Sequence, residues 1–393
     1  MFSASASFAL DFNKDPMAGF KAAMENNGNE APAASDPAAD RAALPEWTVM
    51  VFINGKNDLA NFGDSDVNEM EVVGSTAKMN VVVELGMLKK GVKRYFVTKD
   101  KNEFDLSSPV VQDLGSPDMG DWKHLVDFAN WAKAAYPAKR YMLVIWNHGS
   151  GWVSTKGISY DDETRNHIST PELGLAMKAI GKVDILSMDA CLMQMAEVAY
   201  ELKDTARITV GSEENEPGDG WGYNEFLSRV HSNQAGLTPD VMAAAAVQGY
   251  KAFYAPKGTA TTQSAIRTSG LAKYRQLLDQ WAELAMKEDK AVLTAARDAA
   301  VGFGGAGSKD LTNFMELVHA RTQNAALKAK TAETMKHFYD KVLIDNGTTG
   351  AKFEKAYGLG VYLPGYSFDA DYSELAWSRE GKWDEFMQWL TAK

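Results

Sequence analysis

Two apolar runs in the sequence each end at a side chain that can do chemistry. The first reads YMLVIWNHG and presents His148, and the second reads DILSMDAC and presents Cys191. Cys191 is the only cysteine of the chain, which excludes an intrachain disulfide framework and a thiolate-rich zinc site. The thiol is therefore either a small buried hydrophobic group or a nucleophile.

These two runs belong to a series of short strand-like segments that alternate with helical patterns. We expect strands at 47–55, 79–86, 93–100, 141–149, 184–191 and 207–214, and helices at 124–136 and 171–180. Such alternation predicts an α/β fold in which helices cover both faces of a mostly parallel sheet, with the alternating run 93–100 at its edge. Functional residues of such sheets gather at the carboxyl ends of the strands. His148 and Cys191 both lie at that end, one helical crossover apart, so we expect them to be neighbours.

The side chains at the two strand ends suit acyl transfer. We expect Cys191 to open a helix, whose free amides and dipole would lower the pKa of the thiol and favour the nucleophilic thiolate. The imidazole of His148 is a natural general acid or base near neutral pH. Gly149 leaves its amide unshielded, so the amides of Gly149 and Cys191 can together hold a developing oxyanion.

Other residues compete for these roles. His167 lies in the polar loop after the first motif and is an alternative base. Ser150 is an alternative nucleophile, but Gly-Ser-Gly after His148 lacks the strand–Ser–helix elbow that exposes a serine. Taken alone, His148 could also be a histidine with a structural role in a turn. Its expected pairing with Cys191 makes this interpretation less favoured.

Together the motifs resemble those of the clostripain family of cysteine peptidases, whose caspase-like fold is shared with caspases, gingipains and legumains. The resemblance rests on WNHGSGW, DACLMQMAEVAYEL and SEENEPGDGWGY, and it extends to WTVMVFINGKNDLA, SKDLTNF, YGLGVYLP and WDEF, over roughly residues 47–390. It implies a caspase-like α/β/α sandwich with a helical C-terminal extension, and it implies His148 and Cys191 as the catalytic dyad. Asn147 stands where many relatives carry aspartate, which should change the polarity beside His148 without removing the dyad.

The resemblance also implies cleavage after arginine or lysine. A cationic side chain needs a carboxylate in its pocket to offset the loss of solvation. Asp189 precedes the nucleophile by two residues and Asp219 follows the next strand, so we assign both to this pocket, with Glu213 and Glu214 as further candidates. Either aspartate would also fit a structural cap or a solvated loop charge.

Family members are often single-chain precursors that cut themselves between the histidine and cysteine motifs. The polar segment 153–169 contains Lys156 and Arg165, both of which a pocket for basic residues would accept. Lys156 is the better candidate, because Gly157 after it should ease the extended conformation that a protease needs.

The proposed chemistry requires no cofactor, although some relatives need calcium. Oxygen ligands for a structural or activating calcium ion are available in this segment at Asp161, Asp162 and Glu163. Three adjacent carboxylates do not define a coordination shell, so an ordinary acidic loop is the favoured interpretation.

The 393 residues divide by composition into three parts. Residues 1–45 predict a flexible N-terminal tail, residues 46–232 the catalytic core, and residues 233–393 a helical region with a late strand, packed on the core. The formal net charge of -11 argues against nonspecific nucleic-acid binding. No apolar run approaches the ~18 residues of a membrane span.

We therefore expect an endopeptidase for proteins or peptides with arginine or lysine, present as a monomer or as two associated fragments after self-cleavage. The alternatives are a catalytically silent module that retains basic peptides in an acidic pocket, and another acyl-transfer enzyme such as a transpeptidase. The family resemblance favours an extracellular or periplasmic location. The start of the chain, MFSASASFALDF, lacks a basic n-region and is a poor secretory signal.

Overall fold

The computed structural model describes residues 43–102, 104–153, 156–232, 236–305 and 307–392. The predicted tail and the possible signal segment fall within residues 1–45, which lie almost wholly outside the described residues. Residues Leu44–Lys393 form one compact unit.

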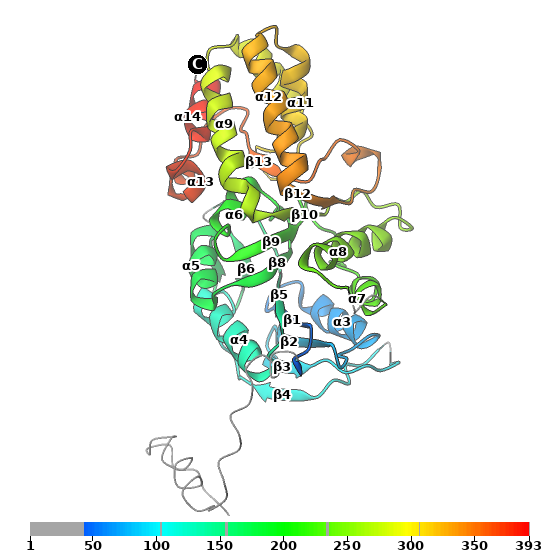
Figure 1. The fold of residues 1–393 in the computed structure, drawn as a ribbon. Coiled ribbons are helices and arrows are strands. Elements are labelled where there is room, and N and C mark those ends of the chain that lie inside the picture. Colours follow the sequence, from blue (N-terminus) through cyan, green and yellow to red (C-terminus); the bar gives the residue numbers. More distant parts are fainter. Residues whose placement is uncertain (1–42, 103, 154–155, 233–235, 306, 393) are drawn as a thin grey trace, which may run out of the picture. The chain divides into compact units, whose positions relative to one another are not determined.

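A nine-stranded sheet runs through the centre of this unit, in the order β12-β10-β9-β8-β5-β1-β2-β3-β4 (Figure 1). The strands are β1 (Trp47–Gly55), β2 (Met79–Met87), β3 (Gly91–Phe96), β4 (Val110–Asp113), β5 (Arg140–Trp146), β8 (Val183–Asp189), β9 (Ala206–Gly211), β10 (Ser264–Arg267) and β12 (Leu343–Asn346). The central strands β2, β1, β5, β8 and β9 pair in parallel, and the outer strands pair antiparallel.

Helices cover both faces of the sheet (Figure 1). One face carries α4 (Trp122–Ala135), α5 (Thr170–Ile180) and α6 (Ala196–Glu201), and the other carries α3 (Ala60–Glu71), α7 (Tyr223–His231) and α8 (Pro239–Tyr254). Along β5, Leu143 and Ile145 pack into one core while Met142 and Val144 pack into the other. Both faces are apolar because both are covered, which confirms the predicted mostly parallel α/β/α sandwich.

The remaining helices gather beyond the β10–β12 end of the sheet (Figure 1). They are α9 (Leu271–Ala285), α10 (Lys290–Ala299), α11 (Leu311–Arg321), α12 (Ala325–His337), α13 (Ala376–Arg379) and α14 (Trp383–Thr391), with short helical turns at Thr268–Gly270, Phe338–Val342, Ala351–Phe353 and Ala370–Glu374. β11 (Ser308–Asp310) and β13 (Gly360–Tyr362) form a separate two-stranded sheet. The predicted boundary near residue 232, between a catalytic core and a C-terminal region, stays a prediction. Two strands that follow this boundary in the sequence, β10 and β12, belong to the main sheet. Among the described residues, no helix is both long enough and apolar enough to cross a membrane.

Three elements differ from the sequence-based expectations. The run at 93–100 is not an edge strand, because β3 pairs with β2 on one side and with β4 on the other. The late strand is shorter than expected and pairs outside the main sheet, as β13. No helix opens at Cys191: Leu192 has a φ of 64°, which a right-handed helix cannot continue, and α6 begins only at Ala196.

Aromatic packing by α14 joins the end of the chain to the C-terminal helices. Phe386 is fully buried, with its ring centroid 5.1 Å from that of Trp281 and 5.2 Å from that of Trp383. Phe386→Ala should therefore lower the free energy of unfolding by about 3–5 kcal/mol, measured by urea denaturation. Tyr366→Ala is the control, because that side chain is 96% exposed. Equal effects of the two substitutions would contradict the packing described.

Candidate active site

The pairing of β5 with β8 determines how the two motifs meet. Trp146 lies opposite Asp189 in the parallel register, and the Asn147 amide donates a hydrogen bond to the Asp189 carbonyl at 3.2 Å. His148 and Cys191 each follow the last residue of their strand by two positions. The two residues therefore leave the same edge of the sheet at matching positions.

Both residues line one cavity of about 300 Å³ at this edge, together with Asp189, Glu216, Gly218 and Gly220. Its volume suits a single side chain or a short ligand segment. A larger depression, of about 760 Å³, lies at the opposite, amino ends of the strands and contains neither motif. The chemistry-bearing residues thus share the smaller cavity.

The thiol of Cys191 is half-buried and surrounded by main-chain amides. The Glu216 amide donates a hydrogen bond to Sγ at 3.3 Å. Burial raises the pKa of Cys191, while hydrogen bonds from the amides of Glu216, Gly149 and Cys191 itself oppose this shift. The expected lowering of this pKa is wrong, because no helix begins at Cys191. The thiol needs a base or a bound substrate to become a thiolate.

Gly149 is required by the close approach of the two motifs. A Cβ atom at Gly149 would lie 2.4 Å from the Cys191 carbonyl oxygen and 2.9 Å from Cγ of Met193. The absence of a side chain lets the segment after β5 pack directly on the segment after β8. The amides of Gly149 and Cys191 both approach the sulfur as a result, so two main-chain donors lie beside the thiol.

His148 contacts a carboxylate that the sequence did not single out. Its Nε2 lies 2.7 Å from Oδ1 of Asp58, and the imidazole stands edge-on to the Tyr160 ring with centroids 6.2 Å apart. A carboxylate bound to one ring nitrogen fixes the orientation of a catalytic imidazole. We did not predict Asp58 from the sequence. The segment NGKND closes the first strand, so Asp58 lies at the same edge of the sheet as His148.

Asp189 lies buried in the cavity wall. It accepts hydrogen bonds from the Tyr223 hydroxyl at 2.8 Å and from the Trp221 amide at 3.2 Å. A Cβ atom at Gly220, whose φ is +56°, would lie 3.0 Å from Oδ1 of Asp189, so glycine lets the chain pass close to this carboxylate. Burial raises the pKa of Asp189 to about 6.

A second carboxyl group, that of Glu216, lies against Asp189 and was also missed by sequence reasoning. Burial and the negative charge of Asp189 raise the pKa of Glu216 well above its ordinary value. Of the predicted pocket residues, Asp219 does not line the cavity, and its Oδ2 lies 2.9 Å from Nζ of Lys257.

The further candidates Glu213 and Glu214 face the C-terminal region. Glu213 accepts a hydrogen bond from the Gly358 amide at 3.1 Å, and Glu214 accepts one from the Gly304 amide at 2.7 Å. Neither lines the cavity that contains the thiol. The path of the segment SEENEPGDG decides which of its acidic residues reaches the cavity, and the sequence does not determine that path.

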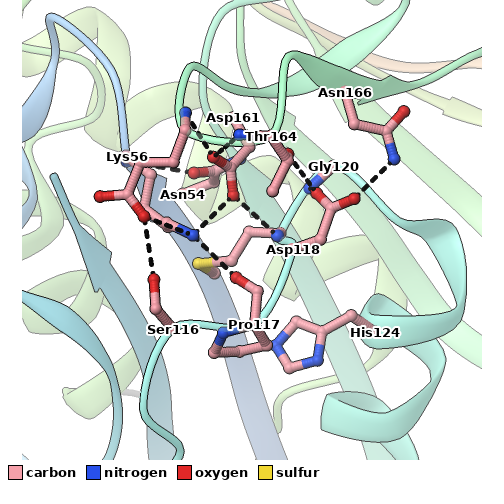
Figure 2. Close-up of polar contacts among 12 residues, drawn as sticks. Asn54, Lys56, Ser116, Pro117, Asp118, Gly120, His124, Asp161, Thr164 and Asn166 are labelled. Carbon is pink, nitrogen blue, oxygen red and sulfur yellow. Dashed lines mark hydrogen bonds and ion pairs between the residues drawn. The ribbon is translucent and has the colours of Figure 1, made fainter. Parts of the chain in front are cut away.

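A buried lysine anchors the hairpin between the two motifs, which consists of β6 (Ile158–Asp161) and β7 (Asn166–Ile168) (Figure 2). Lys56 is fully buried, and its Nζ lies 2.9 Å from Asp161, 3.0 Å from Glu163 and 2.8 Å from the Pro117 carbonyl oxygen. Figure 2 also shows Asp118 bound to Thr164 and Asn166, at 2.7 Å and 2.8 Å. The hairpin is therefore attached to the core on both sides.

Two of the three predicted calcium ligands, Asp161 and Glu163, are already engaged in these ion pairs. The carboxylates of Asp161 and Glu163 already surround the ammonium group of Lys56, so a divalent cation would have to displace a buried lysine. In the part of the chain that the structure describes, no group of three or more His, Cys, Asp or Glu side chains could hold a metal ion. These residues do not fit a calcium ion.

Both self-cleavage candidates are exposed and lie in turns. Lys156 precedes β6 and donates its amide to the Val153 carbonyl at 3.0 Å, whereas Arg165 lies in the tight β6–β7 turn with a φ of 60° and donates its amide to the Asp161 carbonyl at 2.7 Å. The alternative base, His167, stacks on Tyr160 and does not line the cavity. The alternative nucleophile, Ser150, has its hydroxyl 3.2 Å from the Tyr160 hydroxyl.

Comparisons with known proteins agree with this architecture. A family model described as "Clostripain family" matches residues 51–389. Clostripain of Hathewaya histolytica is 29% identical over an alignment of 147 residues, with a coverage of 33% of this chain and 28% of that protein. The chain thus matches less than a third of the length of this curated relative.

Two solved structures share the fold. One is a secreted C11 cysteine protease from Bacteroides thetaiotaomicron in complex with an irreversible peptide inhibitor, with a TM-score of 0.68 and 22% identity over 86% of this chain and 99% of that one. The other is an inactive zymogen C11 protease from Parabacteroides distasonis, with a TM-score of 0.66 and 17% identity over 86% and 98%.

The fold and the family match together define the class: an α/β/α protein with the fold of the solved C11 cysteine proteases. More narrowly, the chain belongs to the clostripain family.

The buried lysine gives a direct test of how the hairpin is held. Lys56→Met should lower the free energy of unfolding by about 3–5 kcal/mol in urea denaturation, because it leaves the buried Asp161 carboxylate without its cation. Lys336→Met is the matched control, since Lys336 is 74% exposed in its ion pair with Asp340 and should contribute about 0–1 kcal/mol. Similar small losses in both variants would show that Lys56 does not anchor the hairpin.

Proposed function

We propose that the protein is an endopeptidase that cleaves peptide bonds after arginine or lysine, with Cys191 and His148 as its catalytic dyad. The observation that carries this proposal is the shared cavity, in which the thiol, the imidazole and the buried carboxylate of Asp189 come together. A nucleophile, a proton carrier and a recognition group for a cation are the parts that such a peptidase needs.

The proposed reaction proceeds through an acyl-enzyme. Sγ of Cys191 attacks the scissile carbonyl carbon, and the amides of Gly149 and Cys191 hold the negative charge that develops on the oxygen. His148, oriented by Asp58, accepts the thiol proton and gives it to the leaving amine. Water then hydrolyses the thioester, and His148 carries the proton of that step as well. No cofactor takes part.

The basic preference rests mainly on Asp189. This carboxylate is buried beside the nucleophile, so a cation reaching it exchanges its hydration for a charge-assisted hydrogen bond. Asp219 is assigned a secondary role, because its carboxylate is already paired with Lys257 and only its neighbours Gly218 and Gly220 line the cavity. The extracellular location that we propose is supported by the solved relative described as secreted.

A catalytically silent binding module is the second candidate. The raised pKa of Cys191 favours it, because a protonated thiol is a poor nucleophile. The cavity would then retain basic peptides without cutting them. The dyad variants below separate the two candidates.

Removal of either member of the dyad should stop catalysis while leaving the fold intact. Cys191→Ala should abolish hydrolysis of a peptide with arginine before the scissile bond, and His148→Ala should slow it by about a hundredfold or more. Initial rates on a fluorogenic peptide measure the loss, and urea unfolding curves check the fold. Full activity in Cys191→Ala would rule out a cysteine mechanism, and an inactive wild type that binds basic peptides would favour the silent module.

The pocket carboxylate should matter for charged substrates only. Asp189→Asn should reduce kcat/KM for cleavage after arginine by the equivalent of about 2–4 kcal/mol, because the guanidinium loses its buried partner. Cleavage of the matched peptide with alanine in that position should change much less. An equal reduction for both peptides would show that Asp189 has a structural role.

Self-processing should occur at Lys156. Both candidates are exposed, but Arg165 has a left-handed φ of 60°, far from the extended conformation that a protease needs, and one solved relative is described as an inactive zymogen. Active protein should separate into two fragments on a denaturing gel, Cys191→Ala should stay whole, and Lys156→Ala should slow the cut or move it to Arg165. Intact-mass measurement identifies the bond. Fully active wild type that is wholly uncut would contradict a need for processing, and fragments of Cys191→Ala would indicate another protease.

A further inference from the structure

We propose that Glu216 is a second specificity-determining acid of the substrate pocket, which shares one proton with Asp189 until a cationic side chain binds and displaces that proton. This inference rests on the proposed function and deepens it. It assigns to the pocket a second recognition residue and a proton that leaves when the substrate arrives.

Glu216 touches both the nucleophile and the recognition carboxylate. Its amide donates to Sγ of Cys191 at 3.3 Å, and its side chain turns to the Asp189 carboxyl. It also lines the cavity that contains His148. A ligand side chain that enters this cavity therefore comes close to two residues that carry carboxyl groups, one at the end of β8 and one in the loop after β9.

The two carboxyl groups differ in their other partners. Asp189 accepts hydrogen bonds from the Tyr223 hydroxyl and the Trp221 amide, which stabilise its negative charge. Both carboxyl oxygens of Glu216 are fully buried and have no hydrogen-bond donor assigned to them among the described residues, although the Asp189 carboxyl and the Gln263 side chain lie near them. Two adjacent buried carboxylates cannot both be charged at neutral pH. The proton accordingly resides on Glu216, and the charge resides on Asp189.

Further acidic groups lie near the pair. Helix α3 brings Asp66 and Glu69, burial raises the pKa of Glu69 to about 7, and it raises that of Asp66 well above its ordinary value. The other polar groups near the pair are Cys191, His148, Tyr223, Tyr250, Tyr254 and Gln263, and Asp219 lies near Tyr254. The cation near this cluster is Lys257, which is paired with Asp219 at 2.9 Å. The site is therefore short of positive charge.

Binding of a cation then changes the protonation of the pair. In the free pocket, the Glu216 hydroxyl donates to the Asp189 carboxylate. A bound guanidinium stabilises a second negative charge, so Glu216 releases its proton to solvent and both carboxylates face the cation. Since protons compete with the cation, affinity for a basic ligand should rise with pH across the range in which the free pair loses its proton, and fall on acidification. A neutral ligand should release no proton.

Calorimetry with agmatine, a simple guanidinium compound, tests this proposal on the full chain carrying Cys191→Ala, in which the thiol cannot titrate. Titrations at pH 7 in two buffers with different enthalpies of ionisation give the number of protons released. We expect about one proton per agmatine bound. In the double variant with Glu216→Gln, whose amide keeps the size of the side chain and still donates to Asp189, we expect almost none and at least about tenfold weaker binding.

Glu69→Gln is the matched control, because Glu69 is a nearby carboxyl with a raised pKa that does not line the cavity. This variant should still release the proton. If the Glu216→Gln protein released as many protons on agmatine binding as its parent, the inference would be overturned and the proton would come from another group.

A second measurement uses the active enzyme and does not depend on agmatine. Between pH 5.5 and 8.5, kcat/KM for a peptide with arginine should rise more steeply in wild type than in Glu216→Gln, while both should respond alike on the alanine peptide. Parallel profiles on the arginine peptide would refute the role of Glu216. Wild type that hydrolyses the alanine peptide and not the arginine peptide would refute the proposed basic specificity itself.

Discussion

The parallel pairing of β5 with β8 is the constraint on which the rest of the site depends. It places Trp146 opposite Asp189, so the residues two positions beyond each strand, His148 and Cys191, emerge together. A shift of one residue in this register would turn each core side chain of a strand toward the opposite face, where it would meet different packing partners, because both faces are covered here. The hydrophobic core therefore fixes the register, and the register fixes which two side chains can cooperate.

Burial next to this edge has one electrostatic consequence for three different groups. It raises the pKa values of the Cys191 thiol, of Asp189 and of Glu216, because each would carry a negative charge in a poorly solvated place. On the proposed basic specificity, a substrate cation beside Asp189 would offset that cost for all three. In this account a basic side chain is both the group recognised and the charge that helps the thiol to ionise, so specificity and activation share one cause.

Much of this arrangement could be predicted from the sequence, because it follows from local patterns. The apolar runs gave β1, β5 and β8, and their abrupt polar ends located His148 and Cys191. The sequence could not show that Leu192 takes a left-handed backbone conformation, and this conformation removes the helix expected at Cys191. Nor could it show that Glu216 lies beside Asp189 while Asp219 pairs with Lys257, because loop paths depend on tertiary packing. Asp58 reaches His148 from another strand end, a contact that is distant in sequence.

The central claim is that Cys191 is a nucleophile in a cavity that recognises cations. It is tested most directly by treating the full chain with a peptide chloromethyl ketone ending in arginine and mapping the adduct by peptide mass spectrometry. The account predicts a single adduct on Sγ of Cys191, suppressed by agmatine and much slower to form with the reagent ending in aspartate. Labelling at another residue, or equal labelling by both reagents, would contradict it.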